Sequence, residues 1–133
     1  MKIYYAASIW GAPGDENFNL EIIDYMKRFG TVLSEQLFLP DYRKKEHLDT
    51  EMIHDRDIAW VNEADRVVAE CSAASLGVGY EIREGVIRGK PILALYRVQE
   101  KRLSGMIDGC KKGIKVCTYR NIEEAKKGID LFF

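Results

Sequence analysis

The stretch Ser75-Leu-Gly-Val-Gly-Tyr-Glu81 separates two segments of different character. Residues 66–70, shortly before it, are mostly apolar and β-branched, which predicts a buried strand. Residues 80–88 have the helical spacing of apolar side chains, and Gly89 follows where a helix would stop. A strand, a glycine turn and a helix in this order are typical of one unit of a parallel α/β sheet.

The rest of the chain alternates in the same way. Periodicity predicts further strands at residues 3–7, 31–33, 91–96 and 114–117, and further helices at residues 16–29, 50–61 and 122–132. Right-handed crossovers between parallel strands place such helices on both faces of a sheet. We therefore predict one doubly wound α/β domain over residues 1–133, flavodoxin-like or Rossmann-like, with five parallel strands in the order 2-1-3-4-5.

Composition excludes several kinds of partner. The 133 residues are 47% hydrophobic and 31% charged, as in a globular domain, and the formal net charge of -1 gives no basic field for nucleic acid. No apolar run approaches the roughly 18 residues of a membrane span, and the N-terminus lacks the layout of a signal peptide. We expect a protein with neither a nucleic-acid nor a membrane partner.

The cysteines and histidines indicate the compartment and the metal content. The three cysteines are odd in number and form no CxxC pair, which favours a reducing cytoplasm over a disulfide framework. The histidines His47 and His54 have no partners at metal-site spacing. We therefore expect a cytoplasmic protein without a zinc site.

A sheet of this order binds ligands beyond the carboxyl ends of strands one and three. Ser8-Ile9-Trp10-Gly11 follows the first strand, and residues 70–81 follow the third, so both should border one crevice. Ser8 could donate a hydrogen bond to a phosphate or cap a turn, and Trp10 could stack on a nucleobase or cover the core. Glu70, at the end of the third strand, points toward either ligand or solvent.

The glycine turn and two carboxylates carry the chemical hypothesis. Gly77 and Gly79 allow a ligand to approach the backbone before a helix, or else form a tight turn without chemical use. Glu81 could be a carboxylate stabilised by the first turn of a helix, or a nucleophile facing an anomeric carbon. Asp57 shares a helical face with apolar residues, so it is either a second carboxyl for proton transfer or half of an ion pair with an arginine.

Five segments together resemble a known family. They are IYYAASIWG (3–11), HDRDIAWVNEADRVVAE (54–70), SLGVGYE (75–81), GKPILALYR (89–97) and LSGMI (103–107). In this order and at this spacing they resemble the nucleoside 2-deoxyribosyltransferase superfamily, and most closely its deoxynucleoside 5'-monophosphate N-glycosidase (Rcl) type. The resemblance covers nearly the whole chain, and its most specific element is the glycine turn that ends in Tyr-Glu.

The resemblance implies an activity and a set of roles. The activity is hydrolysis of the N-glycosidic bond of a (deoxy)nucleoside 5'-monophosphate through a covalent glycosyl intermediate, without a cofactor or metal. By position, Glu81 matches the nucleophile, Asp57 the acidic residue that supports proton transfer, and Tyr4 a residue near the sugar. The phosphate and substrate contacts that it implies are Ser8, Ile9, Trp10, Gly11, Ser75, Gly77 and Gly79. It also implies a homodimer, in which the neighbouring subunit supplies Ser104, with Met106 beside it.

Other functions remain open from the sequence. A transferase would use the same Glu81 intermediate and pass deoxyribose to a second base, whereas a cytidylate-type hydrolase would accept ribose. A nucleotide-binding module without catalysis is a third alternative. The serines matched to a phosphate cradle favour the hydrolase. Trp10 departs from the arginine usual at its position in the Rcl type, which bears on phosphate binding and base preference.

Overall fold

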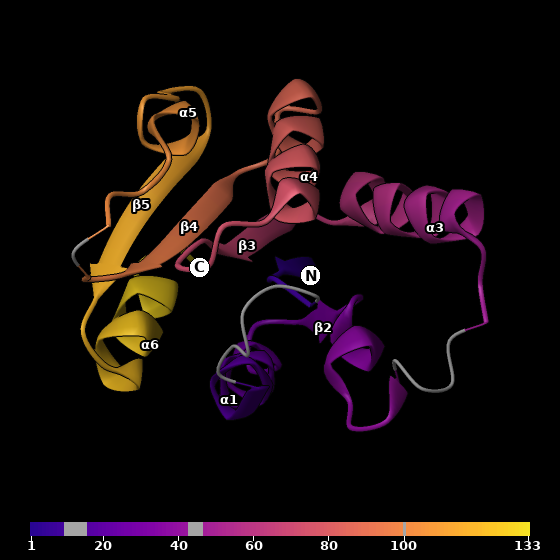
Figure 1. Cartoon of the computed structure of the whole chain (residues 1–133). Coiled ribbons are helices and arrows are strands. Elements are labelled where there is room, and N and C mark those ends of the chain that lie inside the picture. The colour runs from indigo at the N-terminus through magenta and orange to yellow at the C-terminus, as the bar shows by residue number, and fades with distance from the viewer. Residues whose placement is uncertain (10–15, 43–46, 100) are drawn as a thin grey trace.

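A five-stranded parallel sheet forms the centre of the computed structural model, which describes residues 1–9, 16–42, 47–99 and 101–133 (Figure 1). The strand order is β2-β1-β3-β4-β5, and every neighbouring pair is parallel, which confirms the predicted sheet. The strands are β1 (Lys2–Ala6), β2 (Thr31–Val32), β3 (Arg66–Glu70), β4 (Ile92–Arg97) and β5 (Ile114–Tyr119). The predicted site residues Trp10 and Gly11 lie outside the described part of the chain.

Helices cover both faces of the sheet, as the crossover rule requires. The helices α1 (Glu16–Met26) and α6 (Ile122–Asp130) lie on one face, and α3 (Thr50–Glu63) and α4 (Leu76–Ile87) lie on the other (Figure 1). A 3-10 helix, η1 (Glu35–Phe38), follows β2, and a one-turn helix, α5 (Gly105–Asp108), precedes β5.

Alternation along β1 decides which side chains face the site. Ile3 and Tyr5 belong to the core beneath α1 and α6, whereas Tyr4 and Ala6 belong to the core beneath α3 and α4. Successive side chains of a strand point to opposite faces, so this division follows directly from the sequence. It places Tyr4 on the same side of the sheet as the two helices that carry Asp57 and Glu81.

Helix α4 begins earlier than its sequence predicts. It starts at Leu76 rather than at residue 80, because Ser75 caps it: the backbone N–H of Val78 donates to Ser75 Oγ at 3.3 Å. Glycine is a poor helix former, so Gly77 and Gly79 concealed this first turn. Glu81 consequently lies in the second turn of the helix, and the prediction that it sits in the first turn is wrong.

Within the described residues, no helix combines the length and the apolar character needed to cross a lipid bilayer. All three cysteines are free thiols.

Candidate active site

A cavity of about 450 Å³ opens where β1 and β3 end. Its walls come from the segment after β1, from Leu37 and Tyr42, from α3, and from the turn and first half of α4. The predicted site residues that line it are Ser8, Ile9, Asp57, Ser75, Gly77 and Glu81. The switch point of the strand order, between β1 and β3, therefore coincides with a real cavity, as expected for a doubly wound sheet.

Tyr4 does not line the cavity and is buried behind Glu81, to which it is hydrogen-bonded. The Tyr4 hydroxyl donates a hydrogen bond to Glu81 Oε1 at 3.0 Å, and Tyr4 is only 1% exposed. Burial raises the pKa of Tyr4 far above its ordinary value, and the Glu81 charge adds to this effect. The hydroxyl therefore stays protonated and remains a hydrogen-bond donor to the carboxylate throughout the neutral range.

Glu81 has the electrostatic character of a catalytic carboxyl. Burial raises the pKa of Glu81 from 4.5 to about 7; the Tyr4 hydrogen bond opposes this rise, and the charge of Asp57 adds to it. A carboxyl poised near neutrality within a cavity is a marker of functional sites. Glu81 lies beyond the first helical turn, within which the helix dipole acts, and the net change in its pKa is upward, so stabilisation by the helix N-terminus is not supported.

Asp57 lies in the same cavity and is also ion-paired. Arg56 Nε donates to Asp57 Oδ1 at 2.8 Å, and the side chains of both residues are only 15% exposed. Both line the cavity wall. The ion pair with an arginine, one of the two explanations of Asp57 from sequence, is therefore confirmed. The other explanation, a carboxyl for proton transfer, stays a prediction, and the place of Asp57 in the cavity wall is compatible with it.

Arg56 and Tyr42 are cavity residues that the sequence reasoning missed. Arg56 Nη1 donates to the Tyr42 hydroxyl at 2.9 Å, and both residues line the cavity. Adjacent residues of a helix point about 100° apart, so helical spacing alone does not direct Arg56 toward the cavity that Asp57 lines. The long arginine side chain spans that angle. Its proximity to Asp57 in the sequence was the available signal.

Some of the residues that the resemblance matches to a phosphate cradle lie together at the cavity, and others do not. Ser8 and Ser75 line the cavity together with Gly77. A Cβ at Gly77 would meet no described atom closer than Ser75 Oγ, at 3.8 Å, so packing within the described chain does not require glycine there. Gly79 faces a different groove and does not line this cavity.

Glu70 is buried, so the sequence alternative that it points toward solvent is wrong. It is also not among the residues that line the Glu81 cavity. It is 9% exposed and accepts hydrogen bonds from the backbone N–H and hydroxyl of Ser72 and from Tyr119 OH, the last at 2.9 Å. Arg97 N–H in turn donates to Ser72 Oγ at 2.7 Å. Glu70 therefore fastens the start of the β3–α4 connection to the neighbouring strands.

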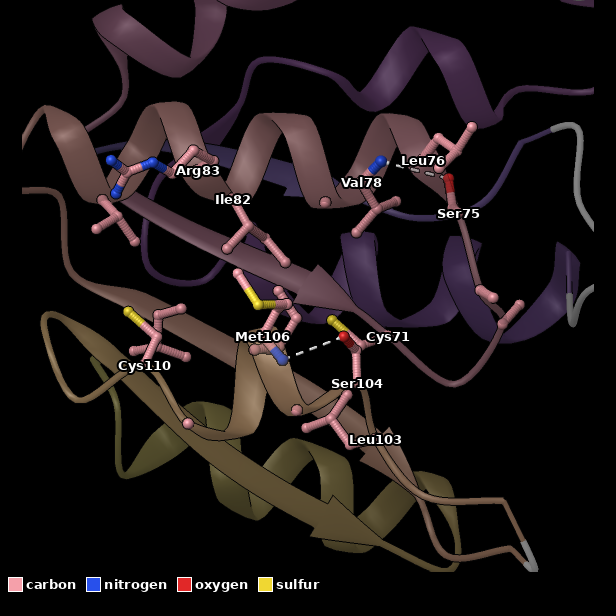
Figure 2. A pocket seen from close by; sticks show the side chains of 18 residues that line it. Cys71, Ser75, Leu76, Val78, Ile82, Arg83, Leu103, Ser104, Met106 and Cys110 are labelled. Atoms are coloured by element: carbon pink, nitrogen blue, oxygen red, sulfur yellow. Dashed lines mark hydrogen bonds between the residues drawn. The ribbon is translucent and has the colours of Figure 1, made fainter.

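A second, larger groove of about 810 Å³ runs between α4 and α5 (Figure 2). Ser104 and Met106 line it, and neither lines the Glu81 cavity. Ser104 caps α5 by accepting from Met106 N–H at 3.3 Å, and Met106 is 84% exposed. The two hollows share a wall formed by Ala74, Ser75, Leu76 and Val78.

Potential metal ligands do not gather around either hollow. In the described ranges, no group of three or more His, Cys, Asp or Glu side chains is arranged to hold a metal ion.

Comparison with known proteins identifies the family. The sequence model described as Nucleoside 2-deoxyribosyltransferase matches residues 3–128. The chain belongs to this family. Two relatives of the chain are named 5-hydroxymethyl-dUMP N-hydrolase. The protein of Mus musculus is 39% identical over 92% of this chain and 73% of its own length, and that of Rattus norvegicus is 36% identical over 99% and 84%.

A solved structure confirms the fold of this deoxyribosyltransferase family member. A CMP N-glycosidase of Clostridium botulinum superposes with a TM-score of 0.77 over the whole of both chains, at 15% sequence identity. This structure confirms the predicted doubly wound α/β class, and the match to the family's sequence model confirms the predicted family.

Proposed function

We propose that the protein hydrolyses the N-glycosidic bond of a deoxynucleoside 5'-monophosphate, giving the free base and deoxyribose 5-phosphate. The observation that carries the proposal is the Glu81 carboxyl, with a pKa of about 7, held by Tyr4 in a cavity that Asp57 also lines. The two rodent relatives named as N-hydrolases of a deoxynucleoside monophosphate support the same reaction.

In the first step, the ionised Glu81 attacks C1' as the bond to the base breaks. The transition state resembles an oxocarbenium ion, so a carboxylate beside C1' stabilises it more than it stabilises the substrate. Tyr4 holds the attacking carboxylate in one orientation through its hydrogen bond. Water then attacks C1' of the glycosyl ester, and Asp57, which lines the same cavity, takes part in proton transfer.

Phosphate and sugar occupy the two ends of one site in this proposal. The 5'-phosphate lies against Ser8, Ser75 and Gly77, near the N-terminus of α4, where backbone N–H groups favour an anion. Glu81 lies more than one turn further along the same helix. This separation accounts for the presence of a phosphate-binding turn and a carboxylate in one short stretch of sequence.

The proposal includes a homodimer that completes the phosphate site. Ser104 lies in a groove that shares a wall with the Glu81 cavity, and this groove carries two highly exposed apolar side chains, Leu76 at 97% and Met106 at 84%. A second copy seated there would bury these side chains and bring its Ser104 toward the shared wall. We also place the protein in the cytoplasm in this proposal, because its three cysteines are free thiols, as is usual in a reducing compartment.

A base-transferring enzyme would use the same glycosyl-Glu81 intermediate and resolve it with a second base. A ribonucleotide hydrolase would differ only in its tolerance of the 2'-hydroxyl. The N-hydrolase names of the rodent relatives favour a hydrolase acting on deoxynucleotides over both.

The test is base release, followed by chromatography. The substrates are deoxynucleoside and ribonucleoside 5'-monophosphates and the matching nucleosides, with and without an added acceptor base. We expect release from deoxynucleotides by the wild type and none by Glu81→Gln. Glu84→Gln is the matched control, because Glu84 lies on the same helix, pairs with Arg88 and does not line the cavity.

Glu81→Gln with wild-type turnover would refute the nucleophile assignment. Nucleotide binding by both proteins without any base release would instead indicate a binding module.

A further inference from the structure

Arg56 is the only basic side chain among the described residues that line the Glu81 cavity. It extends from α3 on the side of Asp57, whereas the proposed phosphate contacts come from the turn before α4 and from the segment after β1. Its charge also acts on the Tyr4 hydroxyl, where it opposes the rise in pKa. The guanidinium therefore lies within electrostatic reach of the Tyr4–Glu81 pair.

The guanidinium is held firmly in this position. Nε donates to Asp57 at 2.8 Å, Nη1 donates to Tyr42 at 2.9 Å, and the guanidinium carbon lies 5.0 Å from the centre of the Trp60 ring. A guanidinium carries five N–H donors in a rigid plane, so one that is anchored to protein groups can also donate to a ligand. Such a preorganised cation stabilises charge that develops in a reaction without first having to move.

We propose that Arg56 is a catalytic residue that stabilises the departing base, by donating a hydrogen bond to the oxygen next to the glycosidic nitrogen of a 2-oxopyrimidine. This role rests on the proposed hydrolase function and adds to it.

The electrons and protons balance as follows. Glu81 forms the new C1'–O bond, and the electron pair of the C1'–N1 bond passes to N1 and, by resonance, to O2. Arg56 keeps its protons and shares one in the hydrogen bond to O2, because a guanidinium does not deprotonate in proteins. Water then forms a new C1'–O bond as the C1'–O bond to Glu81 breaks and the Glu81 carboxylate is released. The proton that the water loses passes, with the help of Asp57, to the base anion.

The chemistry predicts a dependence on the leaving group. A base that carries its negative charge poorly needs the cation most, whereas a base with an electron-withdrawing substituent needs it least. The test measures kcat and KM with 2'-deoxyuridine 5'-monophosphates that carry hydrogen, hydroxymethyl, fluorine or bromine at carbon 5. It compares wild type, Arg56→Gln, Arg56→Lys and the control Arg88→Gln, which removes an exposed arginine paired with Glu84.

We expect Arg56→Gln to lower kcat for the unsubstituted base on the order of 10²-fold, as for loss of one preorganised donor, with a smaller change in KM. The loss should shrink to about tenfold or less with the fluorinated base. Arg56→Lys should recover part of the loss, because it keeps the charge and loses the fork. Arg88→Gln should behave as wild type, and thermal unfolding of each variant checks that it folds.

Three results would overturn the role of Arg56. An equal loss for all four substrates would mean that Arg56 acts only by positioning Asp57. A loss seen with monophosphates and absent with the matching nucleosides would mean that it binds phosphate. Wild-type rates in Arg56→Gln would leave it an ion-pair partner alone. Absence of base release by the wild type would be a different result, because it would refute the hydrolase proposal itself.

Discussion

Replacement of Glu81 by glutamine should stabilise the fold, and by an amount that depends on pH. The pKa of Glu81 is about 7 in the folded protein, against 4.5 ordinarily. At about 1.4 kcal/mol for each pKa unit, ionised Glu81 costs the folded state up to about 3 kcal/mol. Glutamine carries no charge, and its amide oxygen can still accept the hydrogen bond from Tyr4.

The sign follows from proton binding. Between pH 4.5 and about 7 the folded protein binds the Glu81 proton more tightly than the unfolded chain does, so wild-type stability falls as pH rises through this range. The cost is absent at lower pH and complete above pH 7. The stability advantage of Glu81→Gln should therefore grow by roughly 2 to 3 kcal/mol between pH 5 and pH 8.

Urea unfolding of wild type, Glu81→Gln and Glu84→Gln at several pH values measures this advantage. Glu84→Gln reports the effect of removing a carboxylate from the same helix outside the cavity. An advantage that stays constant from pH 5 to pH 8 would refute the raised pKa of Glu81, and with it the burial argument for the site.

Three further predictions concern catalysis. The wild-type kcat/KM should rise with pH through about 7 as Glu81 ionises. Tyr4→Phe should shift this rise to higher pH, because it removes the hydrogen bond that lowers the pKa of Glu81. An unchanged pH profile would contradict the Tyr4–Glu81 hydrogen bond. Asp57→Asn should lower kcat by on the order of 10²-fold, and an unchanged rate would leave only its ion pair with Arg56. Ser104→Ala should raise KM for monophosphates and not for nucleosides, whereas equal effects on both would exclude a phosphate contact.

Sequence periodicity was sufficient to predict the sheet and the place of the cavity. Alternating strands and helices with right-handed crossovers reduce the possible strand orders to a few, and 2-1-3-4-5 is one of the common ones. The alternation of side chains along β1 puts Tyr4 on the side of α3 and α4. These features depend on the pattern of many residues. A local exception, such as the glycines at the start of α4, shifts a boundary without changing the topology.

Features that depend on single side chains could not be predicted in this way. The buried Glu70 accepts hydrogen bonds from Ser72 and from Tyr119. Tyr119 is 49 residues away in the sequence and comes close to Glu70 only because the sheet brings β5 near β3. Arg56 reaches the cavity because its long side chain bends toward its neighbour Asp57, whereas helical spacing alone separates the two. Such contacts depend on rotamers and on tertiary neighbours, and the periodicity of apolar residues specifies neither of them.

The charges in the cavity suggest why Arg56 and Asp57 should lie side by side. With Glu81 ionised, the three charged residues that the structure describes on the wall carry one positive and two negative charges. Cleavage of a glycosidic bond creates positive charge on the sugar and negative charge on the base. Glu81 compensates the sugar, and among the described wall residues Arg56 is the cation that can compensate the base. Asp57 holds that cation in place through the 2.8 Å bond and, by raising the pKa of Glu81, makes its carboxylate a stronger base and so a better nucleophile toward the sugar.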